Sequence, residues 1–183
     1  MNAPRSESRI TAGIVTDAVI CATVALSVIV VAAAVVWLAG LAEELRSTLR
    51  FGFGGVEDSP TEVARLTVHN ARLAGGTLIC AGVASRLKAR ARHLVDLLLA
   101  AVLAFNAAAV GIAIGAYGTR AVTATAAHLP VEFGAFSLTG GAYMQACKRP
   151  IRVRELAATA ASTALLLVAA AALETYVPIG TPR

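Results

Sequence analysis

A histidine and a carboxylate stand four residues apart in the segment His128-Leu-Pro-Val-Glu132. A second carboxylate, Glu174, lies near the end of the last apolar stretch of the chain. A histidine beside a carboxylate can act as an acid/base pair near neutral pH, because the carboxylate orients the ring. Ionisable side chains inside apolar, membrane-spanning stretches are costly and are therefore candidates for function. We interpret His128, Glu132 and Glu174 as candidate catalytic groups.

Four further polar residues are candidates for substrate binding. His69, Asn70 and Arg72 lie together near the start of one apolar stretch, and Asn106 interrupts another. Histidine and carboxylate side chains are also common metal ligands. The three cysteines are isolated and show no metal-ligand spacing. We therefore expect neither a metal nor a cofactor.

Each candidate also has a purely structural interpretation. Glu132 would cap the first turn of its helix, where an acid suits the helix dipole. His128 would be an interfacial residue, and Glu174 would lie among lipid headgroups and pair with Arg72. Asn106 would form a hydrogen bond between helices, worth roughly 1 kcal/mol. The sequence leaves both sets of interpretations open.

The composition predicts where these residues are placed. Of 183 residues, 57% are hydrophobic and only 15% are charged, and the mean hydropathy is +0.73. Soluble domains are usually near half apolar and a quarter charged. These numbers exclude an ordinary soluble enzyme and a disordered chain, and they predict an integral membrane protein in contact with the lipid bilayer.

Five apolar stretches are long enough to be candidate transmembrane helices, each needing ~20 mainly apolar residues. They cover about residues 14–42, 66–85, 94–117, 131–147 and 156–177. We predict an all-α polytopic membrane helix bundle that forms a single domain over residues 1–183. The segment 43–65 reads as an exposed loop, and the small-residue connector 118–127 either stays outside the membrane or dips into it.

The basic residues predict the orientation. The net charge is +5, but Lys and Arg are grouped in short segments between apolar stretches, which is typical of cytoplasmic loops and not of a nucleic-acid-binding face. Two such groups stand at residues 86–92 and 148–154. We expect a protein of the cell membrane with the N-terminus in the cytoplasm and the C-terminus outside. Asp17 would then lie near the cytoplasmic interface, and His69, His128 and Glu174 in the outer half.

An internal repeat is indicated by a shift of 59 residues. The shift aligns His69 with His128, Gly82 with Gly141, and the acid Asp96 with Glu155. Two hairpins, 66–117 and 128–178, would therefore enter the membrane in the same direction, with the first helix outside the repeat. Glycines fall on the first helix of each hairpin and predict that these two helices approach each other closely; they are Gly75, Gly76, Gly82, Gly134, Gly140 and Gly141.

The chain resembles the stage II sporulation protein M family of multi-span membrane proteins, over about residues 69–178. The resemblance rests on His69-Asn-Ala-Arg-Leu-Ala-Gly-Gly76, on the span with Asn106 and Gly111, on His128-Leu-Pro-Val-Glu132 and on Ala-Leu-Glu174-Thr-Tyr-Val-Pro178. The family has Pro-His-Gly followed by an acid four residues after the histidine. This chain keeps the histidine and the acid, with Ala127 and Leu129 in place of the proline and the glycine.

The resemblance implies a membrane subunit that works inside a larger assembly. Family members are similar to components of peptidoglycan-remodelling complexes, of ATPase-driven exporters, and of the maturation or immunity machinery of ribosomally made peptide antibiotics. We therefore expect a peptide or cell-wall substrate and at least one other protein subunit, a membrane protein or an ATPase. A homo-oligomer stays open, and no nucleic acid is expected.

Two functions fit these expectations. The first is a non-enzymatic subunit, permease-like or a scaffold, with a polar site in its outer half. The alternative is a membrane-embedded enzyme subunit that dehydrates, epimerises or cyclises a peptide by acid/base chemistry at His128 and Glu132. Whether the protein is an enzyme is therefore uncertain from the sequence, and neither the substrate nor the partner is identified.

Overall fold

The computed structural model describes residues 4–51 and 56–177, and it contains seven helices and no strand within those ranges. This result confirms the all-α prediction. The helices are α1 (Pro4–Leu38), α2 (Ala42–Leu49), α3 (Pro60–Ala84), α4 (Ala89–Tyr117), α5 (Thr119–Thr125), α6 (Leu129–Lys148) and α7 (Val153–Tyr176).

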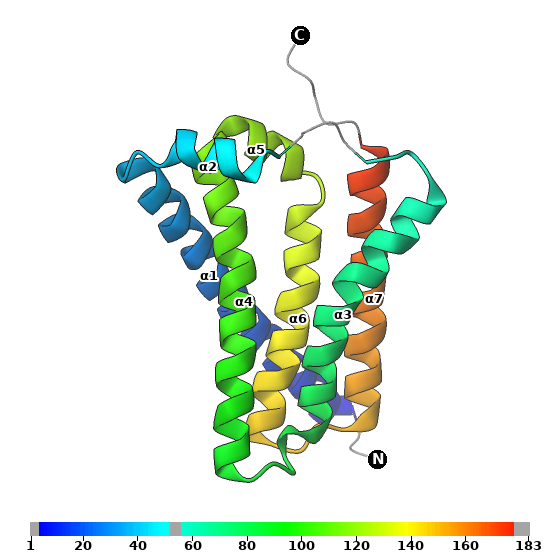
Figure 1. Ribbon diagram of the computed structural model, residues 1–183. Helices are drawn as coiled ribbons and strands as arrows, with labels where there is room; N and C mark the ends of the chain where they lie inside the picture. The colour runs from blue at the N-terminus through cyan, green and yellow to red at the C-terminus, as the bar shows by residue number, and fades with distance from the viewer. Residues whose placement is uncertain (1–3, 52–55, 178–183) are drawn as a thin grey trace.

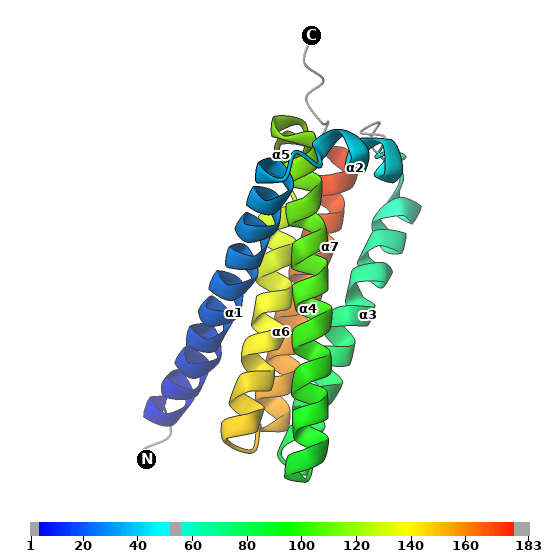
Figure 2. The ribbon, with the colours of Figure 1, turned by 60° about the vertical axis from the view of Figure 1, so that its left-hand side comes forward.

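The five long helices lie side by side, and the short helices α2 and α5 lie across one end of the bundle (Figure 1). The connections 85–88 and 149–152 lie at the other end, which we call the basic end because both basic segments are there. Helices α3 and α6 run towards the basic end, and α4 and α7 return from it. The two hairpins therefore run in the same direction, as the repeat predicts. Helix α1 is tilted against the others (Figure 2).

The distribution of side-chain sizes is that of a protein in a lipid bilayer. Large apolar side chains point outwards along the long helices, with Val19, Val30, Leu97 and Phe105 all more than half exposed. The buried positions are mainly alanine, and Leu167 is the largest fully buried side chain among the described residues. Membrane helices associate through small residues because lipid is as apolar as the side chains it contacts.

Three of the helices are long and apolar enough to cross a membrane, namely α1 over Ala12–Leu38, α4 and α7. Two helices that the sequence also predicts as spans, α3 and α6, lie alongside them without reaching the same apolarity. Helix α6 packs against α1, α3 and α7. A helix enclosed in this way exposes little surface to lipid and needs fewer apolar residues.

The two hairpins differ in their packing. Helices α6 and α7 pack along each other, whereas α3 and α4 hardly touch although only four residues connect them. Helix α4 packs along α1 instead, and α3 packs on α6 and α7. We therefore call the first hairpin open, because its two helices lie apart, and the second hairpin closed. The two hairpins run in the same direction but differ in how their helices pack.

The predicted close packing of α3 on α6 through glycines is only partly right. The two helices are in contact, but Gly75, Gly76 and Gly134 have open space where a side chain would stand. The glycines with the tightest surroundings face α1. A Cβ at Gly141 would meet the backbone of Ile14 and Ala18, and one at Gly111 would meet the backbone of Ile29. The glycines of α4 and α6 therefore allow close packing against α1, which is not part of the repeat.

Several predicted boundaries are corrected. The candidate span within α1, Ala12–Leu38, begins close to the predicted residue 14 and ends before the predicted residue 42. The helix itself begins at Pro4 and ends before Gly40, which has a φ of +67° that favours glycine. The predicted loop 43–65 contains α2 and the start of α3, and its residues 52–55 lie outside the described residues. Helix α3 begins earlier than residue 66 because Ser59 caps it, accepting a hydrogen bond from the Glu62 amide. The connector 118–127 forms α5.

Candidate functional site

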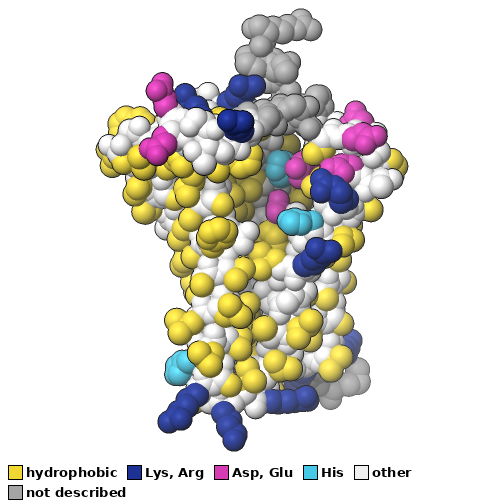
Figure 3. All heavy atoms as spheres, viewed as in Figure 1, with side chains coloured by type: hydrophobic (Ala, Val, Ile, Leu, Met, Phe, Trp, Pro, Cys, Tyr) yellow, Lys and Arg dark blue, Asp and Glu magenta, His cyan; other side chains and the backbone are white. Residues whose placement is uncertain are grey.

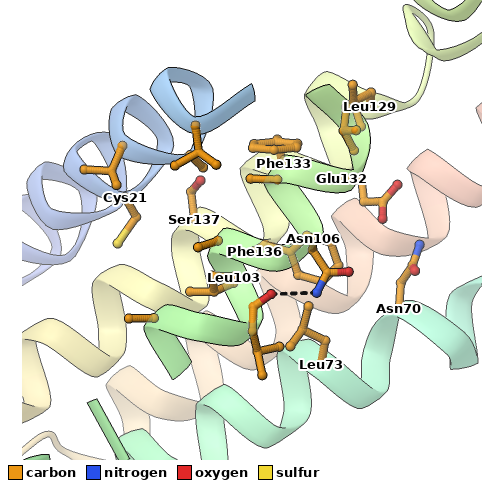
Figure 4. Close-up of a pocket in the computed structure, with 18 of the residues that line it drawn as sticks. Cys21, Asn70, Leu73, Leu103, Asn106, Leu129, Glu132, Phe133, Phe136 and Ser137 are labelled. Atoms are coloured by element: carbon orange, nitrogen blue, oxygen red, sulfur yellow. Dashed lines mark hydrogen bonds between the residues drawn. The ribbon is translucent and has the colours of Figure 1, made fainter. Parts of the chain in front are cut away.

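A pocket with a volume of about 740 Å³ lies between α1, α3, α4 and α6, beside the open first hairpin. Its wall is mostly apolar and includes Val24 of α1, Leu73 of α3, Leu103 of α4, and Phe133 and Phe136 of α6 (Figure 4). A pocket of this size suits a small-molecule ligand, and such sites are usually apolar with a few polar groups that fix orientation.

Five of the seven candidate site residues line this pocket. They are His69, Asn70 and Arg72 of α3, Asn106 of α4, and Glu132 of α6. Figure 3 looks at the same side of the bundle and shows histidine and acidic side chains gathered around the upper part of the hollow between α4 and α3. The remaining two candidates, His128 and Glu174, do not line the pocket.

Glu132 is the carboxylate inside the pocket. It lies in the first turn of α6 and is partly buried, and its side chain and that of Asn70 point towards the same space (Figure 4). Helix α6 begins at Leu129, and His128 precedes it without a side-chain capping bond. No hydrogen bond to the Glu132 carboxylate forms within the described residues. A hydrogen-bonding cap by Glu132 is therefore not supported, whereas its position in the first turn of α6 does suit the helix dipole.

Glu174 on α7 lies close enough to Glu132 for their charges to interact. Arg65, near the end of α3 that lies away from the basic end, is close enough to Glu174 for their charges to interact. Arg65 also holds Glu62 in a bidentate ion pair, with Arg65 Nε 2.7 Å from Glu62 Oε2. This bond lowers the pKa of Glu62, which lies outside the predicted spans. The ion pair of Glu174 with Arg72, one of the two sequence interpretations, does not form among the residues whose side chains are described.

His128 does not form the predicted acid/base pair with Glu132 in this structure. Its backbone carbonyl accepts the Glu132 amide at 3.0 Å, but its ring makes no hydrogen bond to that carboxylate within the described residues. His69 is exposed on α3. The two histidines aligned by the repeat thus differ in setting, since His69 lies inside a helix and His128 just before one.

Asn106 bonds within its own helix. Its Nδ2 donates to the Val102 carbonyl at 2.8 Å, which Figure 4 shows as a dashed line. The proposed hydrogen bond between helices is therefore absent from the described residues. The side-chain oxygen of Asn106 stays available at the pocket, where an amide can accept a hydrogen bond from a ligand.

The pocket has the chemistry of a binding site for an amphiphilic ligand. It offers a cation (Arg72), a carboxylate (Glu132) and two amides (Asn70 and Asn106) above an apolar wall. Within residues 12–51 and 56–177, no group of three or more His, Cys, Asp and Glu side chains is arranged to hold a metal ion.

Sequence reasoning missed a second set of polar contacts, at the basic end. Asp17, expected at the interface, is only 3% exposed, and its carboxylate accepts hydrogen bonds from Lys148 and Gln145 of α6. In the same region Tyr143 of α6 donates a hydrogen bond to Asp96 of α4. The signal that could have found the first pair is an acid near the start of one apolar stretch and a lysine at the matching end of another.

No protein-family model, curated protein or solved structure matches this chain.

Proposed function

We propose that the chain is an integral membrane subunit of a larger assembly that handles a peptide or cell-wall substrate, as a permease-like or scaffold component. In this proposal all five long helices cross the cell membrane, with the basic end in the cytoplasm. The N-terminus then lies in the cytoplasm and the C-terminus outside. At least one partner subunit supplies any nucleotide-driven or soluble step.

The observation that carries the proposal is the pocket that the open first hairpin leaves in the bundle. Polar side chains of three helices meet there, and the pocket wall below them is apolar. A protein that used these residues only to hold its helices together would pair them with each other. Here the carboxylate of Glu132 and the guanidinium of Arg72 make no hydrogen bond or ion pair with described residues.

The second candidate, an enzyme subunit, is favoured by one feature. The carboxylates of Glu132 and Glu174 lie close enough for their charges to interact, and paired carboxylates can divide the roles of acid and base between them. In an enzyme of this kind Glu132 would exchange a proton with the peptide, and Glu174 would assist. The enzyme needs intact proton transfer, whereas the scaffold needs only binding and assembly.

The test is a set of variants in the cell of origin. Glu132→Gln and Arg72→Gln replace charged pocket residues, and Glu43→Gln, exposed on α2, is the matched control. Secreted peptides and released cell-wall fragments are compared by mass spectrometry, and partner proteins are identified by co-purification. We expect the pocket variants to insert normally and lose the product, and the control to retain it. Full activity of both pocket variants would exclude the pocket as the site.

The same experiment separates the two candidates. An enzyme subunit with Glu132→Gln should accumulate an unmodified peptide while its partners still co-purify. A permease-like subunit should retain the correct, modified peptide inside the cell. A scaffold should lose its partner from the purified assembly.

A further inference from the structure

The pocket is a long groove and not a round cavity. Its lining residues on α6 extend from Leu129 to Met144, which at a rise of 1.5 Å per residue is about 22 Å. On α1 the lining extends from Ile20 to Val28. The groove therefore runs along the helices, parallel to the direction in which a lipid chain lies in a bilayer, and it passes between α3 and α4, which do not close it off.

The chemistry of the wall changes along this groove. Towards the basic end it is apolar, with Ile20, Val24 and Met144. The charged residues lie farther from the basic end. Along its own helix axis, Arg72 is about 18 Å from the basic end of α3, and Glu132 is about 24 Å from the basic end of α6. Asn70 lies between these two levels. An apolar floor is therefore followed by a cation, then an amide, then a carboxylate.

Arg72 is the residue that indicates the charge of the ligand. It lies near the middle of α3, is exposed, and lines the groove. Within residues 12–51 and 56–177 its guanidinium has no hydrogen-bond or ion-pair partner. An arginine at this level of a membrane bundle is costly unless a counter-charge meets it. Arginine binds carboxylate and phosphate groups with two parallel hydrogen bonds, so an anionic group of the ligand supplies that counter-charge best.

We propose that the groove binds a single-chain anionic amphiphile, a lipid-linked form of the substrate. The apolar chain lies along α6, the anionic group binds Arg72, and a polar extension beyond it meets Asn70 and Glu132. This inference rests on the proposed function and names the class of its substrate: the peptide or cell-wall fragment reaches the protein attached to a lipid chain. Glu132 accepts a hydrogen bond from an N–H or O–H group of that extension.

The experiment measures binding of a defined probe to the purified, isolated chain. The protein is placed in phosphatidylcholine nanodiscs doped with hexadecyl phosphate, and native mass spectrometry counts the bound probe. Hexadecanol and hexadecyltrimethylammonium carry the same chain without the anion. We expect a stoichiometric complex with hexadecyl phosphate and about tenfold weaker binding of both comparison probes, because a charge-assisted bidentate pair is lost.

Two variants test the two ends of the ligand. Arg72→Gln removes the cation and should weaken binding of hexadecyl phosphate about tenfold. Ala104→Phe fills the groove from α4 and should abolish binding, whereas Ala109→Phe, equally exposed on α4 but outside the groove, should leave it unchanged. Equal binding by all variants, or preference for the cationic probe, would overturn the proposal.

A second readout identifies the natural occupant. Lipids retained by the chain purified from its own cells are extracted and analysed by mass spectrometry. A single-chain lipid bearing a peptide or sugar, lost in Arg72→Gln, supports the inference. Ordinary two-chain phospholipid retained equally by Arg72→Gln overturns it. Because both readouts use the isolated chain, a negative result leaves the cell-based test of the proposed function standing.

Discussion

The carboxylate of Asp17 on α1 binds the ammonium group of Lys148 on α6, with Lys148 Nζ 2.8 Å from each carboxylate oxygen. The amide of Gln145 donates a third hydrogen bond to the same carboxylate at 2.7 Å. The Asp17 side chain is only 4% exposed, while that of Lys148 is 56% exposed. This contact fastens α1, which is not part of the repeat, to the central helix of the bundle.

We expect Lys148→Met to destabilise the protein by on the order of 2 kcal/mol. The substitution leaves a buried carboxylate with a single amide donor, and an uncompensated buried charge is costly. The cost stays below the about 3–5 kcal/mol of a fully buried pair, because the ammonium group is half exposed and screened by solvent. The measurement is the free energy of unfolding in mixed micelles.

The control for this prediction is Lys88→Met, in the other basic connection, where the lysine makes no side-chain capping bond. Combining Lys148→Met with Asp17→Asn should recover part of the stability, because no charge is then left unpaired. If the double variant is as unstable as the sum of the two single variants, the ion pair is not the cause.

Two glycines of α6, Gly134 and Gly141, should differ in how much a substitution by alanine changes the stability of the protein. Gly141→Ala places a Cβ against the backbone of α1 and should destabilise the protein by about 1–3 kcal/mol, the usual cost of overpacking. Gly134→Ala meets open space and should be neutral or slightly stabilising. Thermal unfolding in bicelles measures both. Equal effects at the two positions would mean that α1 does not approach α6 as closely as in this structure.

The contrast between these glycines shows what the sequence could and could not predict. Apolar length and basic connections are local properties, and they located the long helices and the direction of both hairpins. Which helix packs against Gly141 depends on the tilt of α1, a tertiary property that no spacing encodes. For the same reason the glycine spacing predicts the close contact for α3, and no spacing predicts that Asp17 of α1 contacts Lys148 of α6.

At the candidate site, too, the sequence predicts the residues but not the packing that brings them together. The sequence predicts a binding role for four polar residues within apolar stretches, and the structure brings all four to one pocket with Glu132. The four are His69, Asn70, Arg72 and Asn106. The pocket exists because α3 and α4 lie apart. The repeat, in contrast, predicts that both hairpins pack in the same way. Periodicity cannot show which of two similar hairpins is open, because α1 competes with α3 for the surface of α4.

The substitution Asn106→Leu tests whether this pocket residue contributes to ligand binding or to the stability of the helix bundle. Because the hydrogen bond that Asn106 donates among the described residues goes to Val102 in its own helix, the substitution should change the stability by no more than about 0.5 kcal/mol. We expect it to lower the cellular product measured for the pocket variants, since the available amide oxygen is lost. Ala109→Leu, exposed on the same helix outside the pocket, is the control. A large loss of stability would instead assign Asn106 to helix packing.

The orientation is tested by labelling single cysteines in a variant without the native Cys21, Cys80 and Cys147. Asp58→Cys lies before α3 at the end opposite the basic connections, and Arg90→Cys lies at the start of α4. If the basic end is cytoplasmic, a membrane-impermeant maleimide added to intact cells should label Asp58→Cys at once. It should label Arg90→Cys only after the membrane is permeabilised.

The opposite pattern would place the polar end of the groove in the cytoplasm. The anionic group bound by Arg72 would then enter from the cytoplasmic leaflet, and the partner that delivers the substrate would be a cytoplasmic protein. Labelling of both cysteines in intact cells would contradict a bundle in which α3 crosses the membrane, because these two residues mark the two ends of that helix and its connection. The labelling pattern therefore decides both the direction of α3 and whether it spans at all.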